Sequence, residues 1–230
     1  MQVHLPELDY AVVDARNLPC REVGGDFFDV VHDDAGLALV VADVSGKGAS
    51  AAILASTLQG MLYAQLAAGL PLTTIARGVN AYLCAQDTGK YATLVIIRFT
   101  PAGHLEYINC GHLRPLLIRP AKPYTQTGNQ ASIEELSKTN IPVGLLPDTH
   151  FHSGEITLHP GDTLILASDG ITEAEDVHGE FFGPDRLFEI CQRTRGDLLP
   201  ILTSLEELCG STPATDDRTL VSVSYRPGAS

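Results

Sequence analysis

With 230 residues, 44% of them hydrophobic and 19% charged, the chain has the composition of a globular protein rather than a disordered one. The formal net charge of −13 argues against a nucleic-acid or anionic-membrane partner, because binding to phosphate groups requires a basic face. The five cysteines include no Cys-x-x-Cys pair, which argues against a zinc site and a disulfide framework. The N-terminus lacks the basic and apolar regions of a signal peptide, so we expect free thiols in a cytoplasmic protein.

The first informative stretch is REVGGDFFDVV, residues 21–31, in which Asp26 follows two glycines and precedes an apolar run. Taken alone, it is compatible with the turn of a GGDEF-like nucleotide cyclase, with a metal ligand at the start of a strand, or with a plain polar turn. A cyclase requires a carboxylate directly after Gly-Gly-Asp, and that position holds Phe27. No partner motif of a cyclase follows, so the cyclase is a remote alternative. We expect Asp29 to be a structural polar group.

Residues 37–44 form a short apolar run with β-branched side chains, which predicts a buried strand. Residues 48–76 then contain no charged side chain and are long enough to span a bilayer. Because serine, threonine and glutamine interrupt this stretch and its large apolar side chains recur at helical spacing, we expect a buried amphipathic helix instead. A second helix is expected after Pro71. Two strands flanking Pro101-Ala102-Gly103 predict a hairpin.

The second half of the chain continues with a strand at residues 113–120 and a polar surface loop at about 120–140. Residues 155–170 predict a second hairpin with its turn at Pro160-Gly161-Asp162. Helices are expected near 185–194 and 198–209, and a strand at 218–225 closes the chain. Strands grouped with strands and paired helices indicate packed sheets with helices outside them, not a βαβ winding.

Aspartates recur where the apolar runs end or begin: Asp26, Asp43, Asp169 and the pair Asp216–Asp217. Strands packed side by side could bring these carboxylates to one edge of the sheets. Clustered carboxylates repel one another and raise their pKa values, and divalent cations remove that penalty. An all-oxygen set suits Mg²⁺ or Mn²⁺ better than zinc. Each aspartate alone is more often only a turn residue.

Blocks of sequence between about residues 9 and 225 resemble the SpoIIE/RsbU-type branch of the PPM (type-2C) metal-dependent serine/threonine protein phosphatases. In chain order they are REVGGDFFDVV, VVADVSGKGASAAILASTLQ, YATLVIIRF, YINCGHLRPLLI, IPVGLLPD, LILASDGITEA and DDRTLVSVSY. The resemblance implies a single α+β domain over residues 1–230. The implied fold is a four-layer α-β-β-α sandwich, with two antiparallel sheets flanked by helices.

The resemblance also implies a centre of two Mn²⁺ or Mg²⁺ ions. In this sequence Asp43 matches the aspartate that bridges both ions, and the backbone carbonyl of Val44 matches the adjoining ligand. Asp169 and Asp216 match the other carboxylates of the first ion, and Asp26 matches the acidic residue of the second ion. Two ions close together lower the pKa of a shared water that attacks phosphorus, so no side-chain nucleophile is required.

Further residues match the family less directly. Arg21 stands where the wider superfamily has a phosphate-binding arginine, and a plain surface arginine is an equal alternative. Asp217 is expected behind the metal ligands, and His112 is expected at a structural turn. Gly46 and Gly48 permit a tight turn that couples Asp43 to the following helix, residues 49–69. We expect a shift of that helix to switch activity.

The resemblance implies hydrolysis of phosphoserine or phosphothreonine on a regulatory protein, such as an anti-anti-sigma (STAS) domain. A catalytically silent phosphatase-like binding or sensing module is the alternative, against which the retention of all four matching aspartates argues. An activating partner or an upstream sensor domain is expected, because the chain begins almost directly with the matching blocks. A homodimer is possible, whereas no nucleic-acid or membrane partner is expected.

Overall fold

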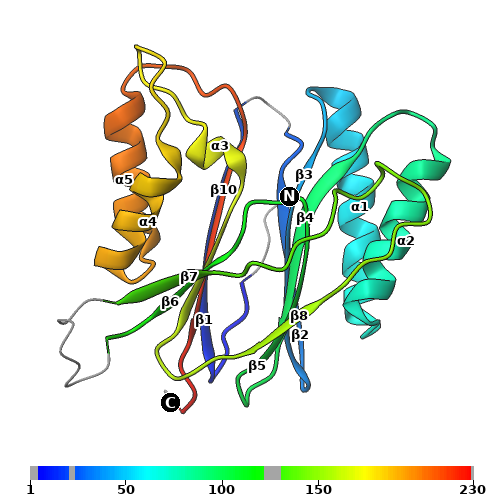
Figure 1. Cartoon of the computed structure of the whole chain (residues 1–230), viewed down its shortest axis with the longest axis horizontal. Helices are drawn as coiled ribbons and strands as arrows, with labels where there is room; N and C mark the ends of the chain where they lie inside the picture. The colour runs from blue at the N-terminus through cyan, green and yellow to red at the C-terminus, as the bar shows by residue number, and fades with distance from the viewer. Residues whose placement is uncertain (1–4, 21–23, 122–130, 229–230) are drawn as a thin grey trace. The chain divides into compact units, whose positions relative to one another are not determined.

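The structure is a computed structural model that describes residues 5–20, 24–121 and 131–228 (Figure 1). The chain forms two compact units. Unit 1 comprises Met1–Pro6, Arg21–His112 and Ser137–Thr157, and unit 2 comprises Glu7–Cys20, Leu113–Leu136 and Leu158–Ser230. Each unit contains one five-stranded antiparallel sheet, which confirms the expectation of two antiparallel sheets accompanied by helices.

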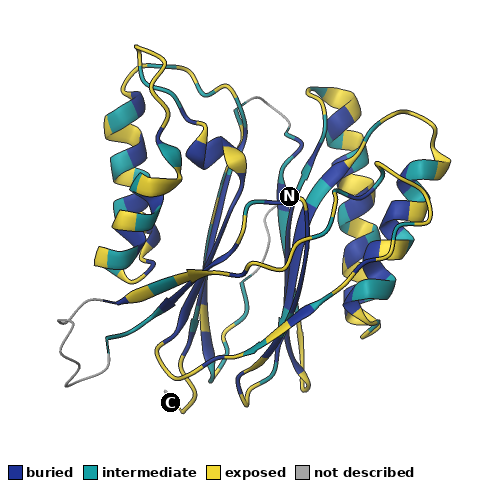
Figure 2. Ribbon diagram, in the orientation of Figure 1, coloured by how far each residue is buried: buried dark blue, intermediate teal, exposed yellow. Residues whose placement is uncertain are grey.

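The sheet of unit 1 has the strand order β2-β3-β4-β5-β8. Its inner strand β3, between β2 and β4, is buried along almost its whole length, which explains the near-continuous apolar run in the sequence (Figure 2). The strands are β2 (Phe27–Asp33), β3 (Gly36–Val44), β4 (Ala92–Phe99), β5 (His104–Cys110) and β8 (Gly154–Thr157). The predicted hairpin about residues 101–103 is the β4–β5 connection.

Helices α1 (Ala49–Ala67) and α2 (Leu72–Ala85) pack on the sheet of unit 1 (Figure 1). The side chains of Leu58 and Leu62 in α1 are fully buried in one core with Val40 of β3. This spacing is the amphipathic pattern that the sequence predicts. No helix in the described part of the chain combines the length and apolar character that crossing a membrane requires.

The sheet of unit 2 has the strand order β1-β10-β9-β6-β7. Its strands are β1 (Ala11–Leu18), β6 (Leu116–Arg119), β7 (Ser132–Glu135), β9 (Thr163–Ala167) and β10 (Arg218–Tyr225). Helix α3 (Asp169–Thr172) follows β9, and α4 (Gly183–Thr194) and α5 (Leu198–Cys209) bury their apolar faces on this sheet. Helices α4 and α5 match the two predicted for this part of the chain.

The predicted hairpin about residues 160–162 is wrong. Its turn exists, because Asp162 N donates to His159 O at 2.9 Å and His159 N donates to the Asp162 carboxylate at 2.9 Å. The flanking strands, however, belong to different sheets: β8 pairs with β5, whereas β9 pairs with β10 and β6. A tight turn in a sequence identifies a change of direction but not the partner of each strand.

The predicted surface loop at about 120–140 contains strand β7, which pairs with β6 in antiparallel register. Residues 122–130 of that loop lie outside the described residues. Strand β7 has the sequence SIEE and is mostly exposed, so it lacks the apolar alternation by which strands are recognised. Its pairing is therefore set by backbone hydrogen bonds rather than by side-chain burial.

Candidate metal-binding site

In unit 1, Asp26 and Asp43 lie at the same end of two paired strands. The register of β2 and β3 pairs Phe27 with Ala42, so its continuation by one residue places Asp26 opposite Asp43. The preceding glycine allows this approach, because a Cβ atom at Gly25 would stand 2.8 Å from Val44 O and 3.3 Å from Asp43 Oδ1. Both aspartates are partly exposed, so ions in solution can reach them.

The loop that follows Asp43 is fixed to the start of β4. Ser45 N donates to Tyr91 O at 2.9 Å, Tyr91 N donates to Ser45 Oγ at 2.9 Å, and Lys90 Nζ donates to Ser45 O at 3.2 Å. Gly46 and Gly48 have φ angles of 97° and 81°, which residues with a side chain rarely adopt. These glycines therefore permit the turn that leads from the candidate ligand Asp43 directly into α1.

Asp29 connects strand β2 to helix α1. Its carboxylate accepts hydrogen bonds from Val30 N at 2.8 Å and from Gln59 Nε2 of α1 at 3.3 Å. Burial raises the pKa of Asp29 above its ordinary value, and the two hydrogen bonds partly oppose that shift. These contacts match the expected structural role for Asp29, because the Gln59–Asp29 hydrogen bond links α1 to the sheet.

In unit 2, Asp169 and Asp216 lie at the ends of the paired strands β9 and β10. Asp169 begins helix α3 and is separated from β9 by Ser168 alone, and Asp216 stands two residues before β10. A Cβ atom at Gly170 would lie only 1.9 Å from Asp217 O, so glycine is required there for the two chain segments to come this close. Asp169 is exposed and Asp216 is half-buried.

Ser168 and Asp217 hold this end of unit 2 together. Thr219 N donates to Ser168 Oγ at 2.9 Å, and Ser168 Oγ donates to Asp217 O at 3.4 Å. Asp217 is 4% exposed, and its Oδ1 accepts from Cys20 N at 2.8 Å. The sequence alone did not identify Ser168 as part of this network. The available signal is a small polar residue between an apolar strand and an Asp-Gly pair.

The residue after Cys20 is Arg21, the candidate phosphate-binding residue, which lies outside the described residues. His112 has the contacts of a structural turn. Its backbone N donates to Asn109 Oδ1 at 2.8 Å, Asn109 Nδ2 donates to His112 O at 3.0 Å, and its Nδ1 lies 2.8 Å from the Thr93 hydroxyl. These hydrogen bonds hold the turn that follows β5, which agrees with the structural role expected for His112.

The candidate ligands are divided between the units, with Asp26, Asp43 and Val44 in unit 1 and Asp169 and Asp216 in unit 2. Among the described residues, no group of three or more His, Cys, Asp or Glu side chains is arranged to hold a metal ion. Within each unit, however, the structure places two carboxylates at one end of a strand pair. Such accessible oxygen donors fit the preferences of Mg²⁺ and Mn²⁺.

Residues 33–226 match the family model of Stage II sporulation protein E (SpoIIE). The protein IcfG of Synechocystis sp. is 29% identical over 262 residues, which cover 98% of this chain and 39% of IcfG. The phosphoserine phosphatase RsbU of Bacillus subtilis is 24% identical over 183 residues, which cover 79% of this chain and 52% of RsbU. The chain thus corresponds to about two fifths to one half of the length of these relatives.

Solved structures share the fold over nearly the whole chain. The RsbU and RsbW domains of Rv1364c from Mycobacterium tuberculosis align with a TM-score of 0.76 and 27% identity, covering 98% of this chain and 62% of that one. The SiaA-PP2C domain of Pseudomonas aeruginosa aligns with a TM-score of 0.77 and 20% identity, covering 93% and 85%. The catalytic domain of the phosphatase PstP, solved with two manganese ions, aligns with a TM-score of 0.66 and 18% identity, covering 94% and 99%.

The fold is therefore the α+β fold of PP2C-type serine/threonine phosphatase domains. Because the family model matches more than half of the sequence, the chain belongs to the SpoIIE family, in the SpoIIE/RsbU-type branch of the PPM phosphatases. Membership of this family argues against the GGDEF-like cyclase alternative.

Proposed function

We propose that this protein is a divalent-metal-dependent phosphatase that removes phosphate from phosphoserine or phosphothreonine on a regulatory protein. The observation that carries the proposal is the placement of aspartates at strand ends in both units. Asp26 lies opposite Asp43, and Asp169 lies beside the segment that contains Asp216. Glycines stand where a side chain would separate these segments. The phosphatase class of the family agrees with this placement.

In the proposed site, Asp26, Asp43, Asp169, Asp216 and the backbone carbonyl of Val44 are the ligands of two Mn²⁺ or Mg²⁺ ions. When bound, such ions lower the pKa of a water molecule and neutralise charge on the phosphoryl oxygens. The contribution of the protein is to hold the carboxylates in place. Ser168 and Asp217 do so through the hydrogen bonds that join β9, β10 and Cys20. Arg21 remains a proposed phosphate contact.

The substrate class is inferred from the relatives. RsbU is a phosphoserine phosphatase, and the related domain of Mycobacterium tuberculosis was solved together with an RsbW domain. A phosphorylated anti-anti-sigma (STAS) protein is accordingly the first substrate to test. An acidic chain of net charge −13 also suits a protein substrate better than a nucleic acid.

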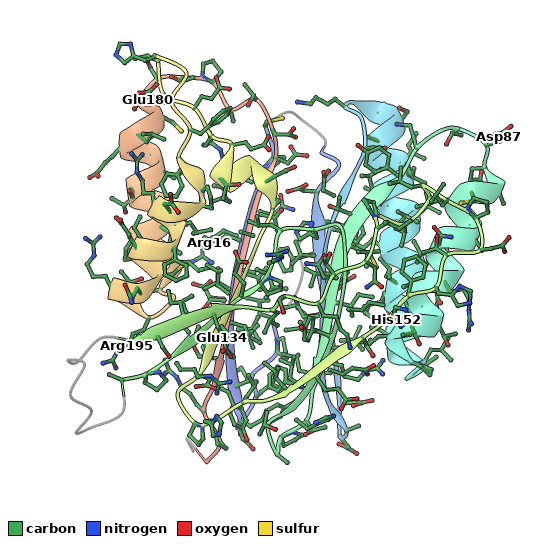
Figure 3. All side chains as sticks on the ribbon, viewed as in Figure 1. Arg16, Asp87, Glu134, His152, Glu180 and Arg195 are labelled. Carbon is green, nitrogen blue, oxygen red and sulfur yellow. The ribbon has the colours of Figure 1, made fainter. Side chains whose placement is uncertain are left out.

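The test is phosphate release from a serine-phosphorylated STAS-domain protein as a function of Mn²⁺ concentration. We expect turnover that requires the metal and falls at least about 1,000-fold in Asp43→Asn and Asp169→Asn, because each change removes a ligand charge. Asp87→Asn is the matched control, since Asp87 lies exposed beyond the end of α2 (Figure 3) and its φ of 49° suits asparagine. Equal turnover in all four proteins, or none at any metal concentration, would refute the proposal.

We further propose that a shift of α1 regulates this activity through the loop that contains Gly46 and Gly48. Such a shift would break the hydrogen bond between Gln59 of α1 and Asp29 of β2. Gln59→Ala should change the Mn²⁺ concentration needed for half-maximal activity, whereas Thr57→Ala on the exposed face should not. Identical Mn²⁺ dependence in Gln59→Ala and the wild type would contradict this role of the hydrogen bond.

A further inference from the structure

Residues 173–182, here called the acidic loop, follow α3 in unit 2 and are fixed at both ends. Glu173 N donates to Asp169 O at 2.7 Å, which joins the start of the loop to a candidate metal ligand. At the base, Phe182 N donates to Ala174 O at 2.7 Å, and both of these residues are 2% exposed. The two ends of the loop are therefore hydrogen-bonded to each other at Ala174 and Phe182, where both are buried in unit 2.

The tip of the acidic loop is ordered by its own backbone. The Asp176 carboxylate accepts hydrogen bonds from Glu180 N at 2.9 Å and from His178 N at 2.7 Å. Asp176 N donates to Glu180 O at 3.0 Å, and Glu175 forms a β-bridge with Phe181. The N–H groups of Glu180 and, to a smaller extent, His178 stabilise the ionised carboxylate, so they hold the pKa of Asp176 below its ordinary value. The tip is therefore preorganised, which reduces the entropy cost of binding a partner.

Two large apolar side chains of this ordered loop face solvent. Val177 is 69% exposed and Phe181 is 56% exposed, although the next residue, Phe182, is buried against Arg186. Figure 2 shows the exposed tip beyond the buried base. Closing the loop requires Phe182 but not an apolar residue at position 181. Apolar surface held rigidly in water is unfavourable, and aromatic side chains are common at the centres of protein interfaces.

Besides Asp176, four residues with carboxylate side chains lie in this loop or just after it in the sequence. Glu173, Glu175 and Glu180 belong to the loop, and Asp185 follows it in the first turn of α4 (Glu180 is labelled in Figure 3). The partner that complements this surface has an apolar pocket bordered by lysine or arginine side chains. A second copy of this chain is a poor fit, because its net charge is also −13.

We propose that the acidic loop is the docking surface for the phosphoprotein substrate, with Val177 and Phe181 entering an apolar pocket of that protein. This inference rests on the proposed function, since the loop begins only four residues after Asp169 and is hydrogen-bonded to it. Docking at the loop would hold the partner beside a residue of the proposed catalytic site. In this proposal Val177 and Phe181 select the substrate, although neither side chain takes part in the chemical reaction.

The test is the affinity of metal-loaded protein for a serine-phosphorylated STAS-domain protein, measured by calorimetry. The double variant Val177→Ser/Phe181→Ser should bind about 10- to 100-fold more weakly than the wild type. Leu199→Gln is the matched control, because Leu199 in α5 of the same unit is also 69% exposed, and it should bind within twofold of the wild type. Thermal unfolding of all three proteins verifies that the fold is retained.

Turnover adds a second readout. The ratio of kcat/KM for the phosphoprotein to kcat/KM for p-nitrophenyl phosphate should fall about tenfold or more in the double variant, because the small ester needs no docking. Binding that falls as expected without any turnover would support docking while refuting the phosphatase proposal. Unchanged binding in the double variant, no binding by the wild type, or loss of self-association instead would overturn the docking proposal.

Discussion

The substitution Gly25→Ala tests whether the GGD loop lies against the end of β3. The added Cβ atom would stand 2.8 Å from Val44 O and 3.3 Å from Asp43 Oδ1, so the backbone of either segment must move by a few tenths of an ångström. The backbone of Gly25 is outside the left-handed region, so alanine is opposed by this contact and not by its own conformation. Both atoms that would be displaced belong to proposed metal ligands.

The expected magnitude follows from two opposing effects. An extra methyl group in a packed site costs about 1–3 kcal/mol, and the lower entropy of the unfolded alanine chain returns about 0.4–1 kcal/mol. The net loss of unfolding free energy is then about 1–2 kcal/mol, which lowers Tm by about 2–8 °C at this chain length. Because metal sites tolerate displacements of only about 0.2 Å, Mn²⁺ affinity should fall about 10- to 100-fold.

The assay combines thermal unfolding with Mn²⁺ titration, and Gly60→Ala is the control. Gly60 is an exposed glycine of α1, and a Cβ added there would meet no atom within 4 Å beyond its chain neighbours and the nearby backbone of its own helix. Alanine there should raise stability by about 0.5–1 kcal/mol and leave Mn²⁺ affinity unchanged. The reasoning is refuted if Gly25→Ala behaves like Gly60→Ala in both measurements.

Three further changes test separate features of the structure. Burial raises the pKa of Asp29, so the folded state favours the protonated form and loses stability as pH rises above the ordinary value of 3.8. In Asp29→Asn the amide NH2 can donate to Gln59 Oε1 once the Gln59 amide reverses, and no charge is buried. This variant should unfold at higher temperature than the wild type at pH 7 but not near pH 3, and equal differences at both pH values would contradict this. Burial raises the pKa values of Cys110 and Cys191 to about 12, so a thiol reagent at pH 8 should label these cysteines only after unfolding. Mass spectrometry that finds both cysteines labelled in the native protein would disprove their burial. Asp162→Ala removes the carboxylate that accepts hydrogen bonds from Arg119 and from His159 N. Urea unfolding should show that the free energy of unfolding falls by about 2–3 kcal/mol. A decrease below about 1 kcal/mol would show that these hydrogen bonds do not stabilise the fold.

The elements with strong hydrophobic periodicity were predictable from the sequence. Strand β3 and helix α1 follow the apolar pattern closely, since both are buried in one core. The apolar run before Asp43 also places that carboxylate at a strand end. The approach of the Asp26 segment to Asp43 follows from the register of β2 and β3, which pairs Phe27 with Ala42 and which a single sequence does not contain.

Features that depend on the partners of a strand were not predictable. The turn at residues 160–162 was recognised, but the strands on its two sides pair in different sheets. Strand β7 escaped recognition because its edge position leaves its side chains mostly exposed. Ser168 likewise acts through the hydrogen bonds of its hydroxyl group, and nothing in the sequence around it states which backbone groups will be its partners.

The central claim, that the strand-end aspartates hold divalent cations for a phosphatase reaction, is tested most directly by counting bound Mn²⁺ ions. Calorimetric titration of the wild type should give two ions per chain, because the proposed bridging role of Asp43 requires a pair of ions. Asp43→Asn should lose both binding events or weaken them at least about 100-fold, while Asp87→Asn should match the wild type. Wild-type protein that binds no Mn²⁺, or an Asp43→Asn variant that still binds two ions with wild-type affinity, would contradict the account.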